Sequence, residues 1–119
     1  MKIAITSQGK DLDAQVDPRF GRAAYILIID SVDETIKVLD NSENVNAFKG
    51  AGIQAAVMVG DSGAGVLLTG FCGPNAFKTL AASGVKVAND ASGTVRNALE
   101  AFKKGEVSFA DDANVEGHW

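Results

Sequence analysis

Residues 24–29 read AYILII, a run without a single charged or amide side chain. A strand with one face in water alternates apolar and polar residues, whereas a strand that is buried on both faces is apolar throughout. We therefore expect residues 24–29 to be a central strand of a sheet with helices packed against both of its faces. This run favours an α/β fold.

The rest of the chain divides into short strand-like and helix-like segments. The β-branched start of the chain predicts one strand, and the alternating segment after the polar connection at residues 30–35 predicts another, which forms a hairpin with residues 24–29. Apolar residues at helical spacing predict three helices, of which the last follows a candidate N-cap, Ser92. The expected strands are residues 2–6, 24–29, 36–39, 66–69 and 85–88, and the expected helices are residues 51–59, a segment that ends at Gly84 and residues 95–102.

This order of elements, β-β-β-α-β-α-β-α, constrains how the sheet is built. A meander of three strands followed by helix–strand units predicts one five-stranded mixed sheet in which strand 2 is antiparallel and helices cover both faces. Residues 1–105 then form a single domain. Residues 106–119 form an acidic tail, which we expect to be loosely held.

The same topology brings several loops to the carboxyl edge of the sheet, where open α/β sheets usually bind ligands. These loops are residues 7–22, 41–50, 70–75 and 89–93, and each of the last three leads into a helix. A helix N-terminus offers free N–H groups and a partial positive charge. We therefore expect three helix N-termini to face one cleft.

Positive charge gathers in the first of these loops, where Arg19 and Arg22 flank Phe20 and Gly21, and Lys49 adds a further cation in the second. Glycines near the helix starts remove side chains where a ligand would approach the backbone, although most such glycines serve turns. An edge of this kind suits a compact anion. We interpret the Arg-Phe-Gly-Arg segment as a lid that places positive charge and an aromatic ring over that anion.

The overall charge restricts the class of ligand. The chain carries a formal net charge of −4 with 11 lysines and arginines, which argues against general binding to nucleic acid or to anionic lipid. No apolar stretch approaches the roughly 20 residues that span a bilayer, and no signal-peptide pattern is present. We therefore expect a cytoplasmic protein without a membrane partner.

Enzyme signatures do not match. The chain has no phosphate-binding loop motif and no nucleophile elbow, its single histidine is His118 in the tail, and strands 2–6 and 66–69 lack the carboxylates of a two-metal nuclease. We expect no catalysis. Cys72 has two interpretations: a small buried hydrophobic residue, or a metal ligand whose pKa is lowered by a helix N-terminus.

Four stretches of the sequence together resemble a known family: MKIAIT at residues 1–6, DPRFGRA at 17–23, LTGFCGPNAF at 68–77 and ASGTV at 91–95. In this order and spacing they are similar to the dinitrogenase iron–molybdenum cofactor biosynthesis family, and closest to its orange-protein group. The resemblance implies a ribonuclease H-like, three-layer α/β/α fold and non-covalent binding of a metal–sulfur cluster without turnover. For the orange-protein group the implied cargo is a molybdenum–copper sulfide cluster, with the iron–molybdenum cofactor or its precursor as the alternative.

The cluster is expected at the carboxyl edge, with Cys72 as a candidate metal ligand. A protein that accepts the cofactor is an implied partner. The other function that we consider is a non-catalytic regulatory or interaction module that docks on a partner ATPase. The candidate cofactor-binding residues are Arg19, Phe20, Gly21, Arg22, Asn41, Gly50, Gly52, Gly70, Phe71, Gly73, Asn75, Ser92, Gly93 and Thr94.

Overall fold

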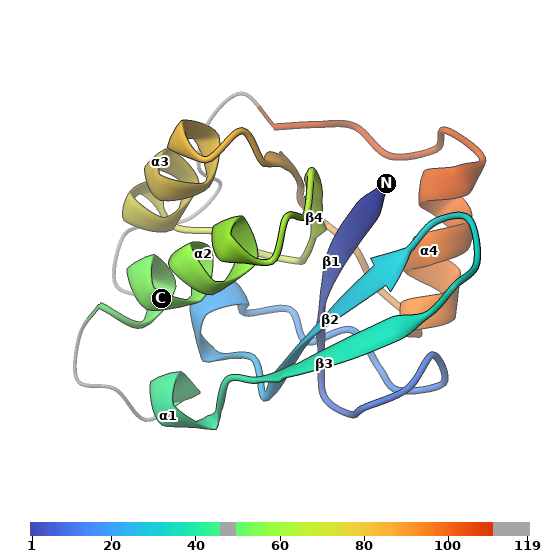
Figure 1. Ribbon diagram of the computed structural model, residues 1–119, viewed down its shortest axis with the longest axis horizontal. Helices are drawn as coiled ribbons and strands as arrows, with labels where there is room; N and C mark the ends of the chain where they lie inside the picture. The colour runs from blue at the N-terminus through green and yellow to red at the C-terminus, as the bar shows by residue number, and fades with distance from the viewer. Residues whose placement is uncertain (46–49, 111–119) are drawn as a thin grey trace.

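A five-stranded sheet forms the middle layer of the part of the protein that the structure describes (Figure 1), which is residues 1–45 and 50–110 of a computed structural model. Strand β2 runs antiparallel to both of its neighbours, β1 and β3, while β4 and β5 run parallel to β1. This confirms the predicted mixed sheet. The strands, in their spatial order, are β3 (Ile36–Asp40), β2 (Tyr25–Asp30), β1 (Lys2–Ser7), β4 (Val66–Leu68) and β5 (Lys86–Ala88).

Helices cover both faces of this sheet. Helices α2 (Ala51–Asp61) and α3 (Pro74–Ala82) lie on one side and α4 (Val95–Lys103) lies on the other (Figure 1). The predicted three-layer α/β/α fold is thereby confirmed. Two short helical segments were not predicted: the 3₁₀ turn η1 (Phe20–Arg22) and helix α1 (Ser42–Val45), both in regions expected to be loops.

Strand β2 shows why the fold needs three layers. Ile26 and Ile28 belong to the core between the sheet and helices α2 and α3, and Leu27 and Ile29 belong to the core under α4. All four side chains are at most 4% exposed. Successive side chains of a strand point to opposite faces, so an unbroken apolar run buries its full length only when both faces are covered.

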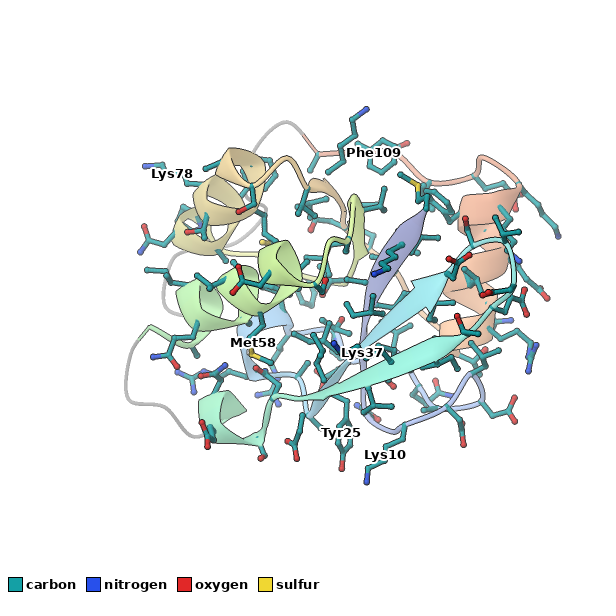
Figure 2. All side chains as sticks on the ribbon, in the orientation of Figure 1. Lys10, Tyr25, Lys37, Met58, Lys78 and Phe109 are labelled. Atoms are coloured by element: carbon teal, nitrogen blue, oxygen red, sulfur yellow. The ribbon has the colours of Figure 1, made fainter. Side chains whose placement is uncertain are left out.

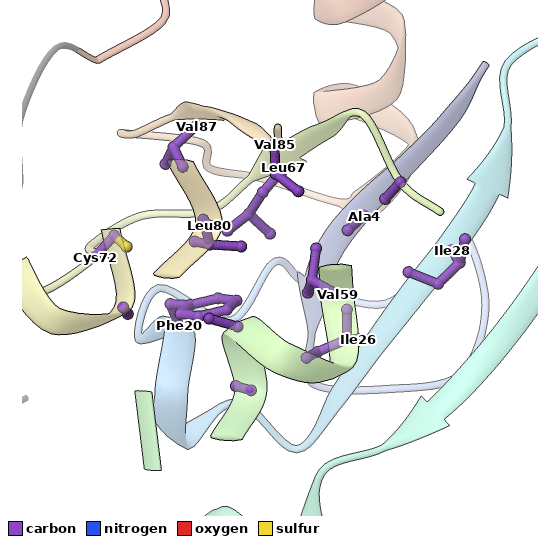
Figure 3. Packing of buried hydrophobic residues seen from close by; sticks show 14 residues of the cluster. Ala4, Phe20, Ile26, Ile28, Val59, Leu67, Cys72, Leu80, Val85 and Val87 are labelled. Atoms are coloured by element: carbon purple, nitrogen blue, oxygen red, sulfur yellow. The ribbon is translucent and has the colours of Figure 1, made fainter. Parts of the chain in front are cut away.

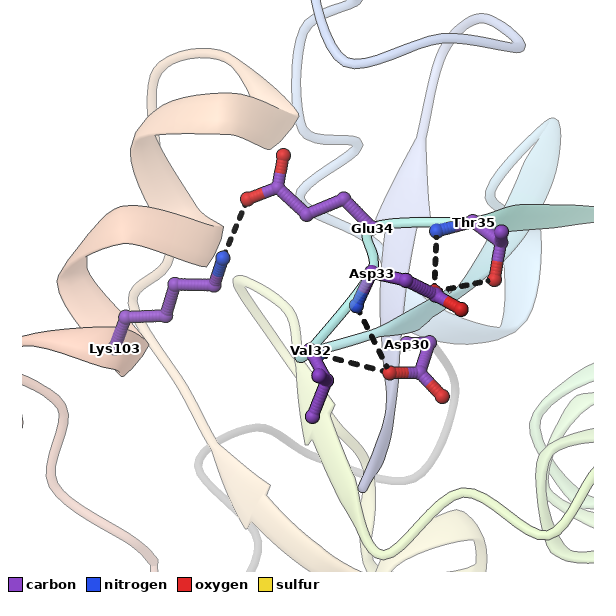
Figure 4. Close-up of polar contacts among 6 residues, drawn as sticks. All are labelled: Asp30, Val32, Asp33, Glu34, Thr35 and Lys103. Carbon is purple, nitrogen blue, oxygen red and sulfur yellow. Dashed lines mark hydrogen bonds and ion pairs between the residues drawn. The ribbon is translucent and has the colours of Figure 1, made fainter.

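The turn between β2 and β3 is tied to helix α4 (Figure 4). The Asp30 carboxylate accepts the N–H of Val32 at 2.8 Å, and the Asp33 carboxylate accepts both the N–H and the hydroxyl of Thr35. The last turn of α4 contacts this turn through an ion pair between Lys103 and Glu34. The two hydrogen bonds that Thr35 donates to the Asp33 carboxylate hold the pKa of Asp33 below its usual range.

The segment after α4 departs from the expectation of a loosely held tail. Phe109 forms an antiparallel bridge with Ala88, and the N–H of Ala110 donates to the carbonyl of Val87 at 2.7 Å. Strand β5 is an edge strand, and its outer backbone groups provide the partners for this pairing. The rest of the tail, including His118, lies outside the described residues.

Within the described parts of the chain, no helix combines the length and the apolar character that crossing a membrane requires.

Candidate functional site

The turn that carries the two arginines is fixed by a buried aspartate. Asp17, 6% exposed, accepts the N–H of Arg19 at 3.1 Å through its carboxylate. Its backbone carbonyl accepts the hydroxyl of Thr6 at 2.7 Å, which ties the turn to the end of β1. Asp17 therefore serves the turn, and Arg19 remains exposed directly after it.

The arginine turn is joined to the loop after β4 by two backbone hydrogen bonds. Phe71 donates its N–H to Pro18, and its carbonyl accepts the N–H of Phe20 at 3.1 Å. The approach is so close that a Cβ on Gly70 would lie 2.7 Å from the carbonyl oxygen of Pro18. Gly70 is thus needed for contact between two loops, and the half-buried Phe71 lies where those loops meet.

Phe20 lies in the core, which corrects the expectation of an aromatic ring held over a ligand. The side chain is 2% exposed. Figure 3 shows its ring among the buried side chains between the sheet and α2 and α3, close to Leu80 and Val59. Burial of a phenylalanine contributes about 2–3 kcal/mol to stability. Phe20 therefore anchors the arginine turn, which forms a fixed wall and not a hinged lid.

Three backbone segments meet at two glycines beside this turn. A Cβ on Gly21 would lie 2.7 Å from both the Cα and the N of Gly52, in the first turn of α2. A Cβ on Gly52 would in turn lie 3.2 Å from the Cβ of Ala76, in the first turn of α3. We expected these glycines to make room for a ligand. The structure shows that they let η1 and the starts of α2 and α3 lie in direct contact.

The N-termini of α2 and α3 are therefore neighbours, and neither has a side-chain cap. Gly50, the N-cap of α2, adopts a left-handed conformation (φ 81°, ψ 5°), and Gly73 is the N-cap of α3. A glycine provides no side-chain acceptor, so the first-turn N–H groups of α2, and those of α3 after Pro74, which has none, retain the capacity to bind an anion. Asn75 lies exposed in the first turn of α3.

Arg19 and Arg22 add permanent positive charge beside these two helix starts. Arg19 is exposed and Arg22 is half-buried, on either side of the glycine that contacts α2. Within the described residues, no carboxylate lies within ion-pair distance of Arg19. The predicted contribution of Lys49 falls outside the described residues. This set of two guanidinium groups and two helix N-termini forms the candidate site.

The side chain of Asn41 holds the backbone of the arginine turn in place. It is 1% exposed, and its amide donates to the carbonyl oxygens of Gly21 at 3.2 Å and Ala23 at 2.8 Å. Its own carbonyl oxygen accepts the amide of Asn44 at 2.7 Å. These hydrogen bonds use both ends of the Asn41 amide. Asn41 therefore positions the arginine turn.

Sequence reasoning missed Asn44, which is 4% exposed and orients Asn41. The signal was the Asn-x-x-Asn spacing of residues 41 and 44, which places both side chains on one side of a helical turn. The polar composition of residues 40–50 suggested a loop instead, and so concealed helix α1.

The third helix N-terminus does not join the site, contrary to expectation. Helix α4 packs on the opposite face of the sheet, and its N-cap is Thr94 and not Ser92. The Thr94 hydroxyl accepts the N–H of Asn97 at 3.1 Å, while the Asn97 side chain accepts the N–H of Thr94 at 3.0 Å. This capping box occupies the donors that a ligand would need. Gly93 instead accepts the N–H of Val16 through its carbonyl.

Cys72 lies between Phe71 and the start of α3 but has no exposed surface. The expectation that a helix N-terminus lowers its pKa is wrong, because burial dominates and raises the pKa of the thiol to about 12. The side chain is therefore a protonated thiol at neutral pH and belongs to the apolar core. Among the described residues, histidines, cysteines and carboxylates form no group of three or more that would hold a metal ion.

Known proteins resemble this chain in sequence and in fold. A family model described as dinitrogenase iron–molybdenum cofactor matches residues 1–105. The structure of the apo form of the orange protein from Desulfovibrio gigas is 46% identical, with a TM-score of 0.93 and 96% of each chain covered. A Thermotoga protein of the DUF35 family is 36% identical, with a TM-score of 0.83 and 98% of each chain covered.

More distant structures show the fold alone. A protein from Methanocaldococcus jannaschii is 21% identical, with a TM-score of 0.68 over 94% of this chain and 96% of that one. No curated protein matches the sequence.

Proposed function

Because the chain belongs to the dinitrogenase iron–molybdenum cofactor family, we propose that it binds and carries an anionic, molybdenum-containing metal–sulfur cluster. The cluster is cargo that the protein holds and passes on to an accepting protein, without turnover. It binds at the carboxyl edge of the sheet, against Arg19, Arg22 and the first turns of α2 and α3.

One observation carries this proposal: two uncapped helix N-termini lie side by side next to two arginines. Gly52 and Ala76 bring the helix starts together, and Gly21 brings the arginine turn against them. Each helix end provides N–H donors and roughly half a positive charge. Guanidinium groups add directional donors that remain charged at any physiological pH. A multiply charged anion with several acceptor atoms satisfies such a set better than a neutral molecule does.

The chemistry of the site favours a cluster that arrives with its sulfides in place. The buried Cys72 remains protonated, so it is a poor donor of a thiolate to a metal. N–H groups and guanidinium groups bind the outer sulfides of a cluster without replacing them as ligands. Non-covalent retention, as opposed to ligation, therefore fits the residues that are present.

The specific cargo that we propose is a molybdenum–copper sulfide cluster. The likeness to the orange protein supports this choice, together with the compact anion site. The iron–molybdenum cofactor or its precursor is the alternative cargo, which the matching family supports.

Reconstitution tests the proposal. The metal-free chain is mixed with tetrathiomolybdate and a copper salt without oxygen, desalted, and analysed for metal content and visible absorption. Molybdenum and copper that co-elute with the protein, with new visible bands, are expected. A colourless, metal-free protein in this experiment, and again with an iron–molybdenum cofactor preparation, would contradict a carrier role and favour an interaction module.

A further inference from the structure

A hollow lies on the α4 face of the sheet, away from the arginines. It has a volume of about 470 Å³ and is lined by Leu68, by helix α4, by residues 88–91 and by residues 106–110. We call it the α4 pocket. Helices α2 and α3, which carry the candidate anion site, pack against the opposite face. The two sites are therefore separated by the sheet.

The floor of the α4 pocket is apolar. Leu68 and Ala88, at most 2% exposed, come from the sheet, and Ala98 and Ala101 come from α4. Alanines at these helix positions leave space that larger side chains would fill. Phe109, which is 42% exposed, contributes an aromatic ring to the wall, and Figure 2 shows it on the segment that follows α4. A volume of this size is typical of pockets that bind small molecules.

Among the described residues that line the pocket, one buried polar atom has no hydrogen-bond partner. The Oδ1 atom of Asn89 is buried, and within the described residues it accepts no hydrogen bond. Most buried polar side-chain atoms are hydrogen-bonded, because an unsatisfied acceptor loses its contact with water without compensation. An N–H or O–H group of a bound molecule would provide the missing donor once the Asn89 amide turns its oxygen toward the pocket.

The charges around the α4 pocket select against anions. Asp90 and Glu106 belong to its wall, and both are exposed. The ammonium group of Lys86 lies 5.6 Å from the centre of the Phe109 ring and forms a cation–π contact with it. Two carboxylates at the wall repel an anionic molecule, so the cluster proposed as cargo does not suit this pocket.

We propose that the α4 pocket binds a small, uncharged aromatic molecule that carries one N–H or O–H group. The ring lies on the alanine floor beside Phe109, and the N–H or O–H group donates to Asn89 Oδ1. This inference is independent of the proposed cargo, because it uses another face of the protein and another ligand chemistry.

Indole and benzofuran are matched probes for this proposal, since they share a shape and only indole has an N–H group. Each is titrated at millimolar concentration into the full-length, isotope-labelled chain while amide chemical shifts are recorded. Saturable shifts confined to residues 88–91, 98–101 and 106–110 are expected. Indole binds about threefold to tenfold more tightly than benzofuran, as expected for one neutral hydrogen bond. Indole-3-acetate, an anion of similar shape, binds more weakly than indole.

Two variants separate the hydrogen bond from the shape of the pocket. Asn89→Ala is expected to bind indole and benzofuran equally, and Ala101→Leu, with unchanged circular dichroism, is expected to bind neither. Three results would overturn the proposal: shifts spread over the arginine turn, no preference for indole in the unmodified chain, or unchanged indole binding in a folded Ala101→Leu variant.

Discussion

Gly21 and Gly52 pack backbone against backbone, with 2.7 Å between the position of a Cβ on Gly21 and the Cα of Gly52. This contact places the arginine turn on the first turn of α2. Because Phe20 is buried and Asn41 holds the carbonyl of Gly21, the turn is fixed from three directions. A site that is organised before binding loses less conformational entropy when its ligand arrives.

A methyl group at Gly21 tests this contact. Gly21→Ala forces its Cβ against backbone atoms that cannot move as a flexible side chain would. We expect a loss of about 1–3 kcal/mol in the free energy of unfolding, measured by denaturant titration. The control is Gly65→Ala, whose Cβ meets only the terminal methyl of Met1 at 3.1 Å. A Gly21→Ala protein as stable as this control would show that the backbones are not in contact.

A substitution at Asn41 tests the hydrogen bonds that hold the arginine turn. In Asn41→Asp the carboxylate cannot donate, so two carbonyl oxygens lose their partner and face a negative charge. We expect the free energy of unfolding to fall by about 3 kcal/mol. Ser42→Ala, at the exposed neighbouring position, should change it by less than about 0.5 kcal/mol. Equal stability of the two variants would argue against the positioning role.

Thr94 and Ser92 form a second matched pair. Thr94→Ala removes the acceptor for the N–H of Asn97 and should lower the free energy of unfolding by about 0.5–2 kcal/mol. Ser92→Ala, which changes an exposed residue outside the capping box, should have no measurable effect. Thermal unfolding of the two variants decides which residue caps α4, and the reverse order of stability would exclude Thr94.

The buried thiol of Cys72 should react slowly with a disulfide reagent at pH 8. With a pKa of about 12, only about one thiol in ten thousand is ionised in the folded protein. Reaction is expected to become fast only in denaturant, which exposes the side chain. Rapid labelling of the folded chain would contradict the burial.

The same pKa makes a prediction about stability and pH. The folded state binds the thiol proton more tightly than the unfolded state, whose pKa is near 9.0. This contribution to stability is complete below about pH 9 and is lost as the pH rises towards 12. Between these values the free energy of unfolding should fall more steeply in the unmodified chain than in Cys72→Ala. Parallel pH profiles for the two proteins would contradict the raised pKa.

Much of the fold could be predicted because the apolar pattern records burial directly. The run at residues 24–29 indicated a strand covered on both faces, and Ile26 and Leu27 indeed lie in two different cores. Helix α1 was missed because three of its four residues are polar, and because its buried Asn44 contacts the sulfur of Met58, which is distant in the sequence. Local sequence does not encode such a contact.

The candidate site was predicted in part. The strand order predicted that the loops of Arg19 and Gly70 lie at one edge of the sheet, and in the structure these loops are joined by backbone hydrogen bonds to Phe71. The face of the sheet that a helix covers depends on how the chain crosses from one strand to the next. Helix α4 covers the face opposite to α2 and α3, so its start does not lie with the starts of those two helices. The burial of Phe20 and Cys72 likewise depends on packing between elements that are distant in sequence.

The most direct measurement of the central claim is cluster retention by the double variant Arg19→Ala/Arg22→Ala. The control is Lys37→Ala/Lys104→Ala, which removes the same charge from exposed positions outside the candidate site, and Figure 2 labels Lys37 on β3. Both proteins and the unmodified chain are reconstituted with tetrathiomolybdate and copper, desalted and analysed for molybdenum. The control should retain as much molybdenum as the unmodified chain, while the arginine variant, folded by circular dichroism, should retain almost none. Full retention by the folded arginine variant would contradict the assignment of the cargo site to the arginine turn.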